Sequence, residues 1–174
     1  EYVNKVIYNW GVTGYVGGHS AADHYADLIG NYFIKGPSSN DHFVGEFKPT
    51  DHIYQAGNFV DLNCDGKLNG RLVVPADFGG PEGPTLIAAP TVIPRQPVPV
   101  VSTADAYRVV MAGAGDSLHR DVVDRRLIDD LASLGQRGQT IHDPAEMGGF
   151  GEISGGPAPV DTDDDGMPDA WETA

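Results

Sequence analysis

Three features that guide many functional assignments are scarce in this sequence. Cys64 is the only cysteine among 174 residues, so no intrachain disulfide can form and cysteine usage indicates no redox compartment. No apolar run approaches the roughly 20 residues that a membrane-spanning helix needs, so we expect no membrane partner. Basic residues are few: 11 Lys and Arg stand against 25 Asp and Glu, for a net charge of −14. Because phosphate is bound by clustered basic side chains, we expect no nucleic-acid partner either.

The first third of the sequence contains a repeat. An Asn precedes an aromatic residue at Asn9, Asn31 and Asn58. The first two are 22 residues apart and the last two are 27 apart, which is typical of repeats that stack as the turns, or rungs, of a solenoid. Residues 1–80 are therefore predicted to form parallel rungs, with the three Asn side chains hydrogen-bonded in a ladder. The alternative is three unrelated boundaries between strand and turn.

The chain changes character after residue 80. Six prolines between positions 81 and 99 exclude regular helix and central strands, because proline lacks the backbone N–H that both require. Residues 81–101 are predicted to form an extended strap that lies along the body.

Two short helices are predicted within residues 102–150, where they would cover the solenoid. Ser102 is a suitable N-cap for the first helix, which is expected to end near Gly113. The second is expected to stop at Gly135. Its apolar face is predicted from the spacing of Val123, Leu127, Leu131 and Leu134.

The strongest chemical motif lies in residues 151–174, which are predicted to be a linker followed by an EF-hand-like calcium loop. Residues 161–172 match the twelve-residue loop at every ligand position: acids at positions 1, 3, 5 and 9, glycine at position 6, and glutamate at position 12. Position 7 contributes a backbone carbonyl. The predicted Ca²⁺ ligands are Asp161, Asp163, Asp165, Met167, Asp169 and Glu172.

A shorter version of the same pattern lies at residues 61–69. It has suitable residues at positions 1, 3, 5, 6 and 9, but Leu72 stands where the bidentate acid should be. Two interpretations remain open, namely weak calcium binding and an Asx-rich turn that closes a rung.

Several of these segments resemble a known family. The stretches Val6-Ile7-Tyr8-Asn9-Trp10-Gly11, Gly17-Gly18 and Gly30-Asn31-Tyr32-Phe33-Ile34-Lys35-Gly36-Pro37 are similar to the late rungs of bacterial family 1 polysaccharide lyases, the pectate lyases. Residues 112–115, 119–128 and 147–150 resemble the tail that these enzymes carry after the β-helix. The resemblance therefore runs in order along nearly the whole chain.

The resemblance implies a mainly β fold, consisting of the late rungs of a right-handed parallel β-helix with a Pro-rich strap and two short covering helices. It also implies a secreted protein, extracellular or periplasmic, that acts on polygalacturonate by β-elimination. In that family Ca²⁺ bridges the uronate carboxylate to acidic side chains, and an arginine removes the C5 proton. Because Ca²⁺ can be shared between carboxylates, the acidity of the chain is compatible with this acidic polysaccharide.

One part of the family pattern is missing here. The arginine-bearing strand and the acids of the catalytic calcium site lie on rungs before the position matching Glu1, so none of the seven arginines is assigned the catalytic role. Arg120, Arg125 and Arg126 are instead expected to pair with acids on a helix face. Catalysis is expected to need the upstream rungs, on the same gene product or on a companion chain.

Two lysines are predicted to contact uronate carboxylates, Lys35 and Lys48, although ordinary solvated loop lysines are the alternative. At the level of the whole chain, the alternative to a lyase component is a non-catalytic module. Such a module would be a calcium-stabilised carbohydrate-binding or structural β-solenoid of an extracellular assembly.

Overall fold

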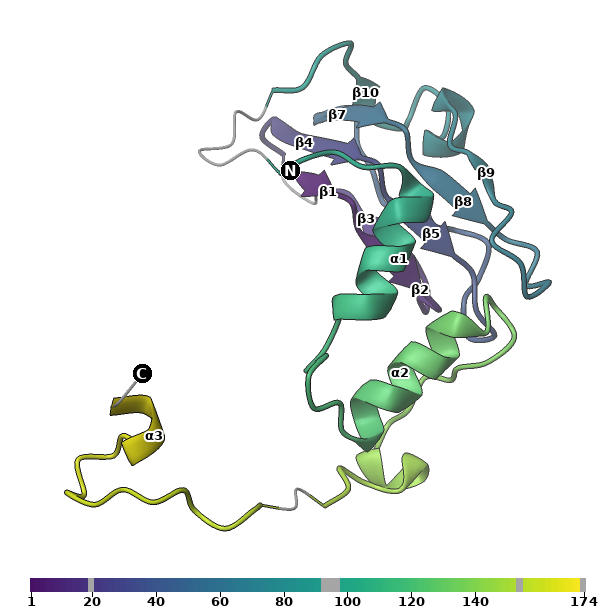
Figure 1. The fold of residues 1–174 in the computed structure, drawn as a ribbon. Coiled ribbons are helices and arrows are strands. Elements are labelled where there is room, and N and C mark those ends of the chain that lie inside the picture. The colour runs from purple at the N-terminus through teal and green to yellow at the C-terminus, as the bar shows by residue number, and fades with distance from the viewer. Residues whose placement is uncertain (19–20, 92–97, 153–154, 173–174) are drawn as a thin grey trace.

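The computed structural model describes residues 1–18, 21–91, 98–152 and 155–172. Figure 1 shows a body of short strands with α1 and α2 lying beside it, and a C-terminal segment that projects away from the helices. The protein is mainly β, with parallel sheets and few helices. Residues 92–97 of the predicted strap lie outside the described residues.

Within the described residues, the strands form three sheets. Their orders are β1-β4-β7-β10, β2-β5-β8-β9 and β3-β6, and every pairing is parallel except β8 with β9. The chain passes through the first, second and third sheets in that order during two successive turns. The strands are β1 Tyr2–Val3, β2 Val6–Tyr8, β3 Tyr15–Val16, β4 His24–Ile29, β5 Tyr32–Ile34, β6 Val44–Gly45, β7 Asp51–Ala56, β8 Phe59–Asp61, β9 Arg71–Leu72 and β10 Thr85–Leu86.

The strand register sets the length of one turn. In the first sheet Tyr2 is aligned with Leu28, and Leu28 with Gln55. In the second sheet Val6 is aligned with Tyr32, and Tyr32 with Phe59. A given place on the first turn therefore recurs 26 residues later and then 27 residues later.

This register confirms Asn31 and Asn58 as members of the predicted Asn ladder and shows that the prediction for Asn9 is wrong. Asn31 and Asn58 immediately precede aligned strands, and the Asn31 Nδ2 donates to the Asn58 Oδ1 at 2.9 Å. Lys5 occupies the aligned position on the first turn, where its backbone N–H donates to the Asn31 Oδ1 at 2.9 Å. Asn9 instead follows β2, and its Oδ1 accepts from the backbone N–H of Ser38 at 2.8 Å.

The corner before each ladder Asn depends on glycine. Gly30 and Gly57 have φ angles of +63° and +62°, in the left-handed region that glycine adopts without a steric penalty. The two glycines turn the chain from the first sheet into the second and bring Asn31 and Asn58 to equivalent places.

Strand β5 is buried on both of its faces. Phe33 points into the cluster enclosed by the sheets, together with Leu28 and Ile53. Tyr32 and Ile34 belong to a second cluster, formed with residues of the covering helices that include Leu131. A three-residue strand with no exposed face needs apolar side chains at every position, and Tyr32-Phe33-Ile34 meets that need.

The first covering helix, α1 Thr103–Gly113, matches its prediction, and the Ser102 hydroxyl caps it by accepting from the Asp105 N–H at 3.1 Å. It lies against β2 and β5. The second, α2 Val122–Ala132, ends earlier than predicted. The remaining helical segments are η1 Pro75–Phe78, η2 Pro144–Met147 and α3 Asp169–Glu172.

The predicted apolar face of α2 is only partly correct. Leu131 is buried, but Leu127 is 55% exposed, and Leu134 lies beyond the helix with a φ of +49°. The next residue, Gly135, passes so close to Cys64 that an added Cβ would lie 2.7 Å from the Cys64 Cα, so this position after the turn requires glycine.

The helix-face pairing predicted for Arg120 is wrong. Its Nη2 donates to the carbonyls of Met111, Ala112 and Ala114 at 2.8, 3.0 and 3.1 Å. These groups lie at the C-terminus of α1, where carbonyls lack partners within the helix. Arg125 likewise donates to a carbonyl, that of Arg120.

The described parts of the strap lie along the first sheet. Strand β10 pairs with β7 as a short edge strand, which a proline-rich segment permits. The Thr91 N–H donates to the buried Asp27 Oδ1 at 3.2 Å. Near the end of the strap, the Asn4 Nδ2 donates to the Pro99 carbonyl at 2.7 Å.

Candidate functional site

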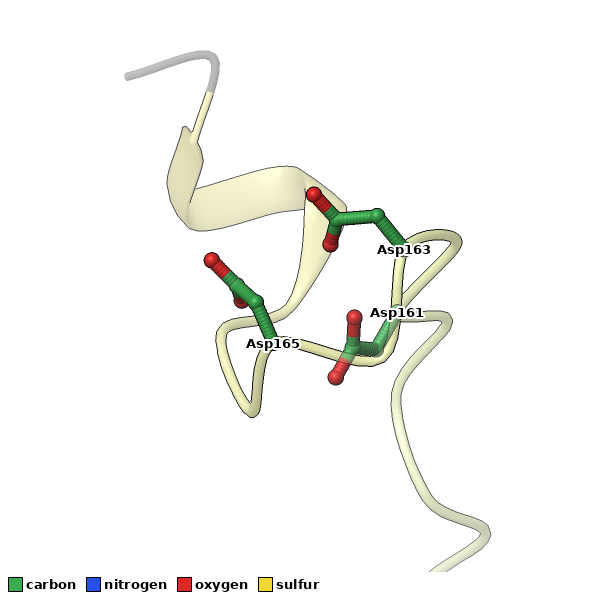
Figure 2. Close-up of side chains that lie close together, drawn as sticks. All are labelled: Asp161, Asp163 and Asp165. Carbon is green, nitrogen blue, oxygen red and sulfur yellow. The ribbon is translucent and has the colours of Figure 1, made fainter.

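The C-terminal loop brings together three of its six predicted calcium ligands. One carboxylate oxygen from each of Asp161, Asp163 and Asp165 lies within 4.8 Å of the other two, and Figure 2 shows the three side chains close together in the loop before α3. Among the described residues, the buried Asp161 Oδ1 has no hydrogen-bond partner, while its Oδ2 accepts from the Gly166 N–H at 3.0 Å. A buried carboxylate oxygen without a partner, beside two further carboxylates, fits a hard divalent cation.

The other predicted ligands are arranged differently. Both carboxylate oxygens of Asp169 accept hydrogen bonds from Thr162, one from its hydroxyl and one from its backbone N–H, each at 2.7 Å. These bonds lower the pKa of Asp169. Glu172 ends α3 with an exposed side chain and lies outside the three-acid group. The Met167 N–H donates to the Asp165 Oδ1 at 2.8 Å.

The loop has the backbone that its sequence requires. Asp164 and Gly166 have φ angles of +57° and +89°, a conformation that favours glycine and tolerates aspartate. The turn at these two positions lets the carboxylates at loop positions 1, 3 and 5 face the same side.

The second candidate loop, residues 61–69, has a similar backbone. Cys64 and Gly66 have φ angles of +53° and +77°, at the positions equivalent to those in the C-terminal loop. The buried Asp61 carboxylate accepts from the N–H groups of Asn63 and Asn69, each at 3.3 Å. These bonds are typical of an Asx-rich turn, and the weak calcium site stays a prediction. The loop borders an open cleft of about 350 Å³ that is also lined by Arg71.

The two predicted uronate contacts come from different loops. Lys35 follows β5, and its Nζ lies 2.5 Å from the Asp41 Oδ1, which raises the pKa of Lys35. Lys48 precedes β7, and its backbone N–H donates to the Asp51 Oδ2 at 2.8 Å. Neither lies on the C-terminal loop of residues 161–172. Their role as substrate contacts stays a prediction.

Sequence reasoning missed a buried polar corner next to Lys48. The Asp51 carboxylate, whose side chain is 2% exposed, accepts from the Gly18 N–H at 3.1 Å and lies 3.2 Å from the His24 Nδ1. Gly18 permits this contact, because an added Cβ would lie 2.8 Å from the Asp51 Oδ1. One sequence feature could have indicated this corner. Asp51 lies two residues before Ile53, so the two side chains point to the same, core-facing side of the strand.

Over the described ranges, no helix combines the length and the apolar character that a membrane span needs.

Comparison with known proteins finds relatives that all carry the same name, probable pectate lyase C. The chain is 38% identical over 180 residues to a probable pectate lyase C of Aspergillus terreus, and 40% identical over 174 residues to one of Aspergillus fumigatus. It is 38% identical over 175 residues to the probable pectate lyase C of Emericella nidulans. Each match covers 99% of this chain and 40–41% of the relative.

No protein-family model matches the chain, and no solved structure matches it. The relatives named above are fungal, so they do not support the bacterial source suggested by the sequence motifs. The chain spans about two fifths of the length of the curated relatives it matches. Over that region, the similarity to these proteins supports the assignment of this chain to the pectate lyase family.

Proposed function

We propose that this chain forms the late rungs of a right-handed parallel β-helix in a calcium-dependent pectate lyase that cleaves polygalacturonate by β-elimination. The observation that carries the proposal is the similarity to probable pectate lyase C proteins over 99% of the chain. The recurrence of aligned strands every 26–27 residues in parallel sheets supports the β-helix.

In this proposal the chain contributes scaffold and substrate contacts, and the proton-abstracting arginine lies upstream. Lys35 and Lys48 would contact uronate carboxylates from the loops between rungs. Calcium, when bound between protein and sugar carboxylates, would supply charge neutralisation that lets an acidic protein hold an acidic polymer. Such a polymer-degrading enzyme would act outside the cell or in the periplasm.

A separate calcium ion is proposed for the C-terminal loop. Its ligands would be Asp161, Asp163 and Asp165, joined by Asp169, Glu172 and the Met167 carbonyl. The unpartnered Asp161 oxygen and the cluster of three carboxylates support the site. Its role would be to stabilise the loop, because several like charges held this closely repel one another without a cation.

A non-catalytic module is the second candidate. One observation favours it: the match spans 41% of each relative. The catalytic residues of those relatives can therefore lie outside the region that this chain matches. In that case the chain would bind an acidic polysaccharide or serve as a structural solenoid in an extracellular assembly.

The lyase proposal is tested by ultraviolet detection of unsaturated uronides released from polygalacturonate, with Ca²⁺ and then with a chelator. The test protein is a chimera in which this chain replaces the matched region of the Aspergillus fumigatus relative, and the unaltered relative is the positive control. We expect calcium-dependent product from the chimera and none from the isolated chain. A folded chimera that releases no product, beside an active relative, would favour the non-catalytic module. Binding of polygalacturonate in affinity electrophoresis would then separate a binding module from a structural one.

A further inference from the structure

The chain that follows α2 is fastened against the loop that follows β5. The Tyr8 hydroxyl donates to the Arg137 carbonyl at 2.5 Å, and the Thr140 N–H donates to the Ser38 hydroxyl at 3.0 Å. These bonds join residues that are 129 and 102 positions apart in the sequence. Residues 137–140 are therefore held beside the loop, and a ligand that binds there has little backbone to order.

A cleft of about 390 Å³ lies between these two segments. Its walls come from the loop after β5, from α2 and from the chain that follows α2. We call it the Arg126 cleft, and it is lined by residues that include Pro37, Arg126, Asp130, Gln136, Arg137 and Gln139. Two of its three charged lining residues are basic, in a chain whose net charge is −14.

Arg126 is available to a ligand. The pairing with an acid on the helix face that the sequence led us to expect is not formed: within the described ranges, no ion pair includes Arg126. The side chain is partly buried, which limits its hydration. Its neighbour Arg125 is exposed, donates to the Arg120 carbonyl and does not line the cleft. The five N–H donors of Arg126 can therefore meet an anion in the cleft.

Arg137 adds a second guanidinium that is only loosely paired. The atoms of closest approach to Asp130 are the Arg137 Nε and the Asp130 Oδ1, which are 3.7 Å apart. This distance is too long for a hydrogen bond. Asp130 offsets one of the two positive charges, so the lining keeps a net positive charge. The Arg137 side chain is 60% exposed and can turn its planar fork to a carboxylate, which it can bind through two parallel bonds.

The groups beside the two guanidiniums suit a sugar. Gln136 and Gln139 are exposed, and an amide offers both donors and an acceptor, as a sugar hydroxyl requires. A carboxylate flanked by hydroxyls is the pattern of a uronate. The cleft also adjoins Lys35, because the Lys35 carbonyl would lie 2.8 Å from a Cβ added to Gly135, at the end of the α2 segment.

We propose that the Arg126 cleft is a further subsite for an acidic polysaccharide, in which Arg126 and Arg137 bind one uronate carboxylate and the two glutamine amides bind its hydroxyls. This inference rests on the proposed function, because polygalacturonate held at Lys35 is the polymer that would reach the cleft. It extends that function by assigning substrate binding to α2 and the chain after it. The subsite acts through guanidinium groups and needs no calcium.

NMR titration of the full chain tests the subsite, with trigalacturonate as the probe and a chelator present to prevent bridging by calcium. We expect saturable shifts of the Arg126 and Arg137 Nε–H resonances and of the Gln139 side-chain amide. Galactotriose lacks the carboxylates and triglutamate lacks the sugar hydroxyls, so each should bind at least about 10-fold more weakly. The proposal is overturned by unmoved arginine resonances, by equally tight galactotriose or by equally tight triglutamate.

A matched pair of variants separates the cleft from the overall charge. Arg126→Gln and Arg125→Gln each remove one positive charge from adjacent positions of α2. Arg126→Gln should weaken trigalacturonate binding about 10-fold, and Arg125→Gln less than about 2-fold. Equal weakening would overturn the proposal. Arg126→Lys keeps the charge without the fork and should fall between Arg126→Gln and the parent. Circular dichroism checks folding, and the resonance shifts of the unaltered chain decide the question if a variant does not fold.

The chimera with the Aspergillus fumigatus relative distinguishes this subsite from the lyase activity. Binding of trigalacturonate by the chain, together with a chimera that releases no product, would uphold the subsite while the proposed function fails. An active chimera together with unmoved arginine resonances would overturn the subsite and leave the proposed function standing. In an active chimera Arg126→Gln should raise KM with kcat nearly unchanged, because the contact holds substrate and transition state alike. An unchanged KM would contradict the subsite.

Discussion

The Asn31 amide donates to the Asn58 amide oxygen across one turn of the stack, at a distance of 2.9 Å, with both side chains fully or almost fully buried. The Asn58 oxygen also accepts from the Asn31 backbone N–H at 3.0 Å, and its Nδ2 donates to the Leu28 carbonyl at 2.8 Å. One side chain therefore pairs three buried polar groups, none of which water can reach.

Replacing Asn58 by alanine should lower the free energy of unfolding by about 2–4 kcal/mol, because it leaves buried donors and an acceptor without partners. Chemical denaturation followed by circular dichroism measures the change. Asn40→Ala is the control, since Asn40 is exposed and its side chain accepts from the N–H of His42 in the same loop. Equal losses in the two variants would show that the ladder has no special role in stability.

The pair formed by Arg71 and Asp77 should make stability depend on acid pH. The Arg71 guanidinium donates to both carboxylate oxygens of Asp77, at 2.6 and 2.8 Å, and this holds the pKa of Asp77 below its usual 3.8. A depressed folded-state pKa gives stability that is present above the unfolded-state value and is lost as the pH falls through the folded value.

We therefore expect Asp77→Asn to be less stable than the parent at pH 7 and to show a smaller loss of stability from about pH 4 downward. Urea unfolding at a series of pH values measures this. The variant Arg71→Gln should reproduce the effect, and the double variant should add little to either. Additive losses would mean that the two residues do not act as a pair.

Calcium binding by the C-terminal loop is testable with a conservative pair of variants. Asp161→Asn should weaken binding by about 10-fold or more, because it removes a charged ligand from position 1 of the loop. Asp164→Asn should change binding far less, because position 4 contributes no ligand. Titration calorimetry of the full chain provides both values, and equal affinities for the two variants would argue against the loop as the site.

The same titration decides between the two interpretations of residues 61–69. If that loop is an Asx turn, the chain binds one calcium ion and Asp61→Asn leaves the stoichiometry unchanged. If it is a weak second site, a second and weaker binding event is present in the parent and absent from Asp61→Asn.

Arg120 should stabilise the end of α1 through the three carbonyls it contacts. Arg120→Gln is expected to cost about 1–2 kcal/mol of unfolding free energy, since these carbonyls lose a charged donor. Arg126→Gln, on the neighbouring helix, should have an effect within about 0.5 kcal/mol. Thermal unfolding compares them, and an unchanged Arg120 variant would show that water replaces the guanidinium without loss.

The sequence allowed the repeat to be recognised but did not reveal its register. Asn9 shares with Asn31 and Asn58 the feature of preceding an aromatic residue, yet it lies at a different corner. The true spacing of 26 residues places Lys5 in the ladder, and there the backbone N–H substitutes for the amide. A ladder position that is filled by a backbone N–H cannot be recognised from a side-chain motif.

The helices illustrate the same limit. The N-cap of α1 was evident because a Ser side chain bonds locally to its own helix. The end of α2 was predicted at Gly135, whereas the helix ends at Ala132. The close approach of Gly135 to Cys64, from a different part of the chain, could not be read from the sequence. In the C-terminal loop, likewise, the acids at positions 1, 3 and 5 come together as the spacing predicts. The carboxylate at position 9 does not join them, because the neighbouring Thr162 offers it two hydrogen bonds.

The bond between Asn4 and Pro99 joins residues 95 positions apart, and this separation has a consequence for how the molecule reaches its native state. Contacts between residues so distant in sequence close a long loop, which slows their formation. During synthesis the first turn emerges well before the strap that holds its corner. The first turn should therefore be the part most exposed to mispairing on the ribosome, and a slow final folding phase should correspond to the docking of the strap.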